Sequence, residues 1–162
     1  MHVRIREVSL VAMVTLVAVS AVAKDQSPSE SRFANYPAAE RKAMEALQGN
    51  WRLVELKRGD EVVSLPDRLL TFDGRQVRVQ GNRARTGESE FVHTYVVNPT
   101  REPAELNIYG DRFLIQAIYR IEGDVLTVAH YGRPEIARAS SFEADGTDDA
   151  GALMTFTYRR VE

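Results

Sequence analysis

The chain has 162 residues, of which 44% are hydrophobic and 27% charged, a composition typical of one ordinary globular domain. Its 21 Lys and Arg residues nearly balance 23 Asp and Glu residues, and the net charge of −2 excludes the strongly basic surface that nucleic acid or an anionic membrane attracts. The chain has no cysteine, which excludes disulfides, thiolate metal sites and a cysteine nucleophile.

The first 23 residues have the pattern of a secretory signal peptide. Arg4 and Arg6 precede an uncharged run, residues 8–23, which ends in the small residues that signal peptidase requires. This run is shorter than the roughly 20 apolar residues of a membrane-spanning helix, so a cleaved signal is favoured over an anchor. The sequence therefore predicts cleavage after Ala23 and a secreted or periplasmic protein with no stable membrane anchor after cleavage.

The next segment changes from polar to amphipathic. Residues 24–36 are polar and rich in Ser, and we expect them to form a flexible linker before a domain that spans residues 37–162. Over residues 37–47, apolar side chains recur at helical spacing among charged ones, which predicts a short amphipathic helix. Gly49 follows as a helix stop.

Eight segments after Gly49 are rich in β-branched, aromatic and aliphatic residues, and short turn sequences with Gly separate most of them. They are residues 50–58, 68–72, 76–80, 90–98, 105–109, 112–122, 125–131 and 152–159. No helical pattern interrupts them, which favours an antiparallel meander over alternating βαβ units. The predicted fold class is all-β: an eight-stranded antiparallel up-and-down barrel, whose closure removes exposed edges, with a short N-terminal helix.

Two of these segments depart from simple alternation. Residues 91–97 and 112–121 carry apolar side chains on both faces, so we expect both strands to be covered on both sides. The N-terminal helix is the candidate cover for the outer face of residues 112–121. The stretch after Pro134 is too long for a tight hairpin and is expected to form a loose, acidic loop.

Five stretches of the chain carry a resemblance to a known family. They are LQGNWRLVEL at 47–56, LLTFDG at 69–74, YVVNPTREPAELNI at 95–108, AIYRIEGDVLTVAHYGRPE at 117–135 and LMTFTYRR at 153–160. Together they resemble a family of small secreted bacterial domains, best known from planctomycetes, which is treated as lipocalin-like and has no assigned biochemical function. The resemblance implies a lipocalin-like barrel, although the Thr-Asp-Tyr-like motif of true lipocalins is absent from this sequence.

The resemblance also places the first and last strands side by side, which gives the single tryptophan of the chain a structural role. Gly49 and Trp51 begin the first strand, and Arg159 and Arg160 lie in the last. We expect Trp51 to close the narrow end of the barrel, with Arg159 or Arg160 across its ring in a cation–π contact.

The sequence favours a binding module over an enzyme. It contains no hydrolase, metalloprotease or phosphate-loop motif, and neither His93 nor His130 has a second metal ligand at i+2 or i+4. No metal, cofactor or catalytic residue is therefore predicted.

An eight-stranded barrel either holds one small ligand or fills with side chains. In the first hypothesis the protein binds a small molecule or lipophile, and the candidate contacts with this small hydrophobic ligand are His93, Tyr95, Phe113, Ile115, Tyr119, Leu126 and His130. In the alternative hypothesis the core is filled, and the domain has a structural or protein-interaction role with a partner that the sequence does not identify.

Overall fold

The computed structural model describes residues 32–64, 67–83, 87–132, 137–144 and 151–162. The predicted signal peptide, its cleavage site and residues 24–31 of the predicted linker lie outside these residues. Within the described ranges, no helix is both long enough and apolar enough to cross a membrane.

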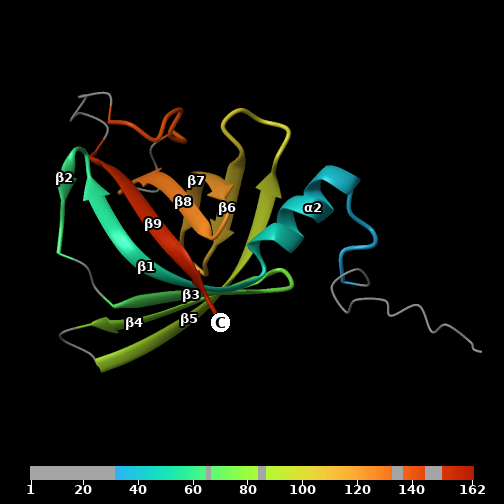
Figure 1. Ribbon diagram of the computed structural model, residues 1–162, viewed down its shortest axis with the longest axis horizontal. Helices are drawn as coiled ribbons and strands as arrows, with labels where there is room; N and C mark the ends of the chain where they lie inside the picture. Colours follow the sequence, from blue (N-terminus) through green and yellow to red (C-terminus); the bar gives the residue numbers. More distant parts are fainter. Residues whose placement is uncertain (1–31, 65–66, 84–86, 133–136, 145–150) are drawn as a thin grey trace, which may run out of the picture.

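One antiparallel sheet closes on itself to form an eight-stranded barrel (Figure 1). The helix is α2 (Ala38–Leu47), and the barrel strands are β1 (Gly49–Arg58), β3 (Arg68–Asp73), β4 (Gln76–Arg83), β5 (Gly87–Asn98), β6 (Glu105–Tyr109), β7 (Leu114–Glu122), β8 (Val125–Tyr131) and β9 (Leu153–Val161). Each strand pairs with the next, and β1 also pairs with β9, which closes the ring. The structure thus confirms the predicted up-and-down barrel with one short N-terminal helix. A two-residue strand, β2 (Glu61–Val62), pairs antiparallel with the end of β1 and was not predicted.

The strands form because apolar residues alternate with polar ones, so that every second side chain points into the barrel. The register keeps the inward residues of neighbouring strands level with one another: Leu70 lies opposite both Trp51 and Val79, and Val128 lies opposite Phe156. Outward residues such as Arg78 are exposed. The core is therefore the interior of the barrel.

A β-bulge in β1 explains an irregularity in its sequence. The pairing with β9 shifts between Leu53 and Glu55, so Val54 is the extra residue. The shift moves Leu56 to the same inner face as Trp51 and Leu53, and all three side chains are buried. Val54, by contrast, is 43% exposed. Without the bulge, strict alternation would place Glu55 in the apolar interior.

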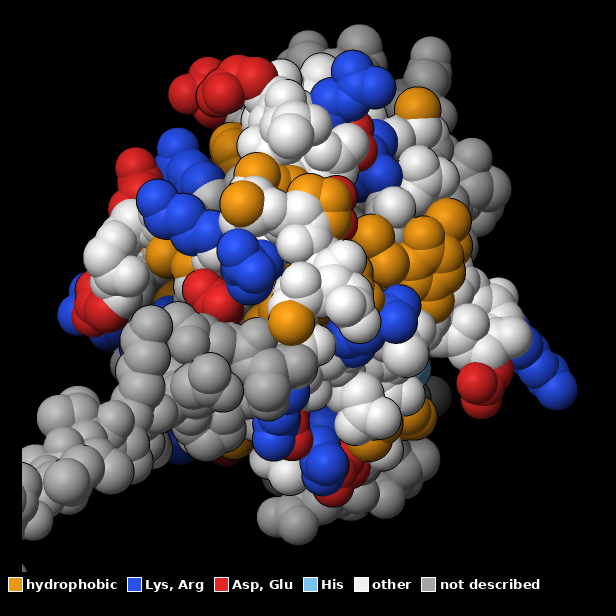
Figure 2. Space-filling view, turned by 90° about the vertical axis from the view of Figure 1, so that its right-hand side faces the viewer, with side chains coloured by type: hydrophobic (Ala, Val, Ile, Leu, Met, Phe, Trp, Pro, Cys, Tyr) orange, Lys and Arg blue, Asp and Glu red, His pale blue; other side chains and the backbone are white. Residues whose placement is uncertain are grey.

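The helix α2 lies at one end of the barrel, which we call the closed end (Figure 1). Its Met44 and Leu47 side chains are buried in the main core cluster. Figure 2 views the molecule from the side that carries α2, where Lys and Arg side chains lie among Asp and Glu side chains. This face therefore has no large area of a single charge sign.

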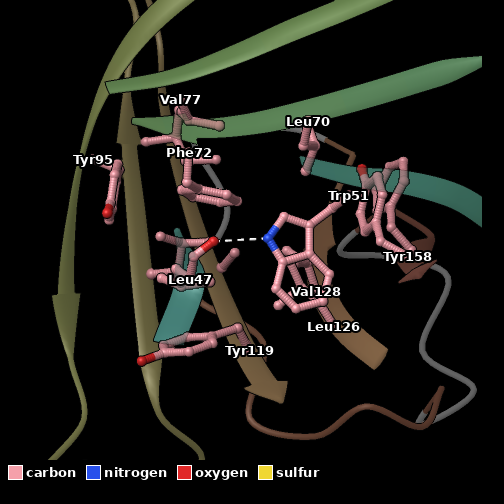
Figure 3. Packing of buried hydrophobic residues seen from close by; sticks show 14 of the residues in the cluster. Leu47, Trp51, Leu70, Phe72, Val77, Tyr95, Tyr119, Leu126, Val128 and Tyr158 are labelled. Carbon is pink, nitrogen blue, oxygen red and sulfur yellow. Dashed lines mark hydrogen bonds between the residues drawn. The ribbon is translucent and has the colours of Figure 1, made fainter. Parts of the chain in front are cut away.

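Trp51 is the centre of the closed end. Its side chain is 0% exposed, and its indole Nε1 donates a hydrogen bond of 2.7 Å to the carbonyl oxygen of Leu47, the last residue of α2. Figure 3 shows the ring packed among Leu70, Leu126 and Tyr158 from three different strands. One side chain thus joins the helix end to the barrel wall and satisfies its own buried N–H group.

Arg160 covers the Trp51 ring, as expected for one of the two terminal arginines. Its guanidinium carbon lies 4.1 Å from the ring centroid, and the same group donates hydrogen bonds to the carbonyl oxygens of Gln48 and Ala46. Arg159 takes no part in this contact, since it alternates onto the outer face. Gly49 has a φ of 107°, and a Cβ atom there would lie 3.1 Å from the Arg160 guanidinium, which explains why this position is glycine.

Gln48 and Tyr95 connect the end of α2 to the turn between β3 and β4. The Gln48 side-chain nitrogen donates to the Tyr95 hydroxyl, which in turn donates to the Gly74 carbonyl oxygen at 2.9 Å. The Gly74 backbone N–H donates to the Gln48 side-chain oxygen at 2.7 Å. Burial raises the pKa of Tyr95 well above its usual value, so this hydroxyl stays protonated as a donor.

The packed domain begins before residue 37. Phe33, which the sequence pattern places in the linker, is 1% exposed and belongs to the main core cluster, and Tyr36 packs against this cluster. Arg32 also forms an ion pair with Asp73 in the turn between β3 and β4. At least residues 32–36 therefore belong with the barrel.

The expectation that residues 91–97 are covered on both sides is wrong. The outward-facing Val92 and Val96 of β5 are 48% and 39% exposed. Val is favoured in strands because its branched side chain suits the pleated backbone, and this preference does not require burial on both faces.

The outer face of β7 is covered, but by a different segment from the one expected. Ile118 on this face packs in a second core cluster with Ala129, Leu153 and Ala139, and Phe142 lies against them. The helix α2 was the expected cover, yet its apolar face belongs to the interior cluster. The cover is residues 137–144, part of the stretch that was expected to be a loose loop.

Arg138 fixes this cover to the barrel wall. Its guanidinium forms an ion pair with Glu105 at 3.5 Å and donates to the Asn107 side-chain oxygen at 2.6 Å and to the Ala117 carbonyl oxygen. Both charged side chains are largely buried, at 19% and 27% exposed. Such a pair holds its partners in one geometry, because breaking it would leave an uncompensated charge.

The closed end provides a test of which contact holds the barrel together. Trp51→Ala should lower the free energy of unfolding by about 3–5 kcal/mol, because it removes a fully buried aromatic side chain. Arg160→Ala should cost about 1–2 kcal/mol, from the cation–π contact and the hydrogen bonds to carbonyl oxygens. Urea denaturation measures both values.

Arg159→Ala is the matched control and should change the free energy of unfolding by less than about 0.5 kcal/mol, as is usual for an exposed residue. If Arg160→Ala lowers the free energy of unfolding as much as Trp51→Ala does, packing of the Trp51 ring is not the larger contribution to stability.

Candidate ligand-binding cavity

A cavity of about 240 Å³ lies inside the barrel at the end opposite α2, which we call the open end. Its lining is mainly aliphatic and aromatic, with a few polar groups. The lining residues are Arg68, Leu70, Phe72, Val79, Phe91, His93, Leu106, Ile108, Phe113, Ile115, Val128, His130, Phe156 and Tyr158. None of these residues is acidic.

Aromatic side chains form the mouth of the cavity. His93 lies parallel to Phe91, with ring centroids 6.3 Å apart, and edge-on to Phe113 at 5.1 Å. Phe91 and Phe113 are 40% and 39% exposed although they line the cavity, so they mark where it meets solvent. Large apolar side chains that are both exposed and part of a concave lining are typical of a binding site.

The turn between β6 and β7 positions Phe113. Gly110 donates its backbone N–H to the Phe113 carbonyl oxygen at 3.0 Å, and the Phe113 ring lies directly against Gly110. A Cβ atom on Gly110 would lie only 2.4 Å from that ring. Glycine at this turn therefore permits the ring to take its place at the mouth.

His130 is the first polar group of the cavity wall. Its Nδ1 atom lies 2.7 Å from the carbonyl oxygen of Tyr131, and because a carbonyl only accepts, Nδ1 carries the proton. The ring stacks on Phe156, with centroids 5.3 Å apart. Burial lowers the pKa of His130, and the nearby positive charge of Arg68 lowers it further. In the neutral ring Nε2 is an acceptor.

Arg68 and Tyr158 are polar groups of the same lining, in addition to His130 and His93. The Arg68 guanidinium carbon lies 5.5 Å from the Phe156 ring centroid, and Tyr158 lies two residues after Phe156 in β9. Burial raises the pKa of Tyr158 to about 12, against the opposing effect of the nearby positive charge of Arg68. Tyr158 is therefore a neutral hydroxyl at ordinary pH, and Arg68 is the charged group of the lining.

Four of the seven predicted ligand contacts line the cavity: His93, Phe113, Ile115 and His130. The two histidines, far apart in sequence, thus face the same space. The other three, Tyr95, Tyr119 and Leu126, are 0–5% exposed and lie in the packed part of the core.

Sequence reasoning missed Arg68, Phe156 and Tyr158. The signal for Arg68 was present, because strict alternation with Leu70 and Phe72 places it on the inner face of β3. Likewise, Tyr158 lies two residues after Phe156 in β9. What the sequence did not show is that these strands place Arg68, Phe156 and Tyr158 next to one another.

Among the residues that the structure describes, no group of three or more His, Asp or Glu side chains is arranged to hold a metal ion.

The fold and the cavity together define a class of structure, a lipocalin-like eight-stranded β-barrel with an apolar internal cavity. In comparisons with known proteins, no family model and no curated protein matches the chain. The fold therefore follows from the structure, and the resemblance to the planctomycete family stays a prediction.

The buried position of His130 predicts a pH dependence of stability. Its pKa in the folded protein lies below the value of about 6.5 expected when unfolded, so the unfolded chain binds a proton there more readily. Lowering the pH from 7.5 to 5.5 should therefore reduce the free energy of unfolding. In His130→Asn, whose amide can still donate to the Tyr131 carbonyl oxygen, this contribution should be absent. Urea denaturation across this pH range measures the free energy of unfolding of both proteins. If this free energy falls by the same amount in the wild type and in His130→Asn, His130 is not the source of the pH dependence.

Proposed function

We propose that the protein binds a small, mainly apolar molecule inside the barrel, as a binding protein and not as an enzyme. The observation that carries this proposal is the cavity of about 240 Å³ at the open end, with its aliphatic and aromatic lining. Concave apolar sites with a few polar groups are the usual form of small-molecule sites.

The volume indicates the size of the ligand. An apolar cavity of about 150 Å³ holds benzene, which has six non-hydrogen atoms, whereas drug-sized sites begin near 300 Å³. By simple proportion, 240 Å³ holds about ten non-hydrogen atoms. A short aliphatic chain or a ring with a short substituent fits this size, and a longer ligand would project through the mouth.

The asymmetry of the barrel favours this function over a filled core. At the closed end, Leu47, Trp51 and Leu126 pack with no exposed surface. At the open end, the inward residues Val79 and Ile115 are only partly buried and line open space. A purely structural domain gains stability by packing its interior throughout, because cores approach crystal-like density.

The lining also favours binding over catalysis. General acid–base chemistry requires groups poised to exchange a proton with a substrate, often a histidine oriented by a carboxylate. His93 and His130 share the cavity, but no carboxylate is among the lining residues that the structure describes. Secretion after signal cleavage and kinship with the planctomycete lipocalin-like family, both predicted from the sequence, accord with a binding role outside the cytoplasm.

Binding of 1-octanol, which has nine non-hydrogen atoms, tests the proposal. Isothermal titration calorimetry should show saturable binding to the wild-type protein. Val79→Trp, which adds bulk inside the cavity, should weaken binding at least about tenfold. Overpacking costs about 1–3 kcal/mol, so the folded state of this variant is checked by circular dichroism and thermal unfolding.

Val92→Trp is the matched control, because Val92 lies on the neighbouring strand but faces outward and is 48% exposed. Its affinity for 1-octanol should equal that of the wild type. Absence of binding to the wild type, or equal weakening by both variants, would contradict binding inside the barrel.

A further inference from the structure

We propose that the cavity selects an amphiphile with a carboxylate head group and that Arg68 is the residue that pairs with this head group. This inference rests on the proposed function, since it names the chemical class of the ligand that the barrel binds. The apolar lining takes the chain of the ligand, and the charged group of the lining takes its head.

Arg68 occupies the inner face of the barrel near the open end. It begins β3, where alternation directs it inward together with Leu70 and Phe72, and all three residues line the cavity. Its guanidinium lies over the Phe156 ring instead of in open solvent, and the residue is only partly exposed. A positive charge is thus held against apolar surface inside a binding cavity.

The described residues do not offer Arg68 a negative partner. Five ion pairs involve Arg32, Lys57, Arg78, Arg120 and Arg138, and none involves Arg68. No acidic residue is among the described residues that line the cavity. Holding a charge away from water is costly unless it is paired, so a ligand that supplies an anion gains more here than it would at the surface.

The donors around Arg68 match a carboxylate. A guanidinium presents five N–H groups in a planar fork, and this fork binds the two oxygens of a carboxylate side by side. The Tyr158 side chain lines the same cavity, and its pKa of about 12 keeps its hydroxyl proton available to donate. No acceptor for that proton is found among the described residues. Arg68 and Tyr158 are therefore two donors in one cavity wall, with no acid among the described lining residues.

A comparison of two probes of nearly equal size separates the head group from the chain. Octanoate has ten non-hydrogen atoms and is ionised at pH 8, because carboxyl pKa values lie near about 4; 1-octanol has the same chain and no charge. The wild-type protein should bind octanoate at least about tenfold more tightly than 1-octanol, as measured by isothermal titration calorimetry at pH 8.

Arg68→Gln should remove this preference: octanoate should bind at least about tenfold more weakly than it binds the wild type, and no more tightly than 1-octanol binds the same variant. Arg68→Lys, which keeps the charge but loses the fork, should retain part of the preference. Arg78→Gln is the matched control, because it removes the same charge from the outer face of β4, and it should change neither affinity.

The outcomes distinguish this inference from the proposed function. If 1-octanol binds and octanoate binds no better, or if Arg68→Gln and Arg78→Gln have the same effect on octanoate, the head-group assignment is overturned and binding in the barrel stands. If neither probe binds the wild type, both proposals fall. Binding of 1-octanol by Arg68→Gln shows that this variant is folded. If Arg68→Gln does not fold, the affinities of Arg68→Lys for octanoate and 1-octanol are compared with those of the wild type instead.

Discussion

The pairing of β1 with β9 is the constraint on which the rest of the structure depends. It extends from Asn50 to Arg58 and turns an open meander into a closed barrel, so that no long strand edge is left unpaired. It also places Arg160, from the last strand, over the ring of Trp51 in the first strand. The Arg160 guanidinium then donates a hydrogen bond to the Ala46 carbonyl oxygen at the end of α2. Only a closed ring has an interior, and both the packed core and the cavity follow from that closure.

The two ends of this interior differ because of what covers them. At the closed end, α2 supplies Leu47 and Met44, and Trp51 fills the remaining space, so the interior is dense. At the open end the mouth is bordered by aromatic side chains such as Phe113. Side chains that would otherwise complete a core there line open space instead. The polar side chains of the lining, Arg68, His93, His130 and Tyr158, lie in this part.

Much of the fold could be predicted from the sequence, because alternation of apolar and polar residues acts locally. All eight barrel strands follow from it, and so does the helix before Gly49. Four of the seven predicted ligand contacts line the cavity, since alternation tells which face a residue occupies but not its depth. Tyr95 and His93 share a face of β5, yet Tyr95 is buried beside α2 while His93 reaches the mouth.

The sequence by itself determined the class of the fold, the number of barrel strands and the contact between Trp51 and a terminal arginine. The tertiary structure decided three other features: the bulge that returns Leu56 to the interior, the cover that residues 137–144 place on β7, and the meeting of Arg68, Tyr158 and His130 in one wall. The reason is physical. Periodicity is a property of neighbouring residues, whereas these features depend on the register and curvature of strands that meet only when the barrel closes.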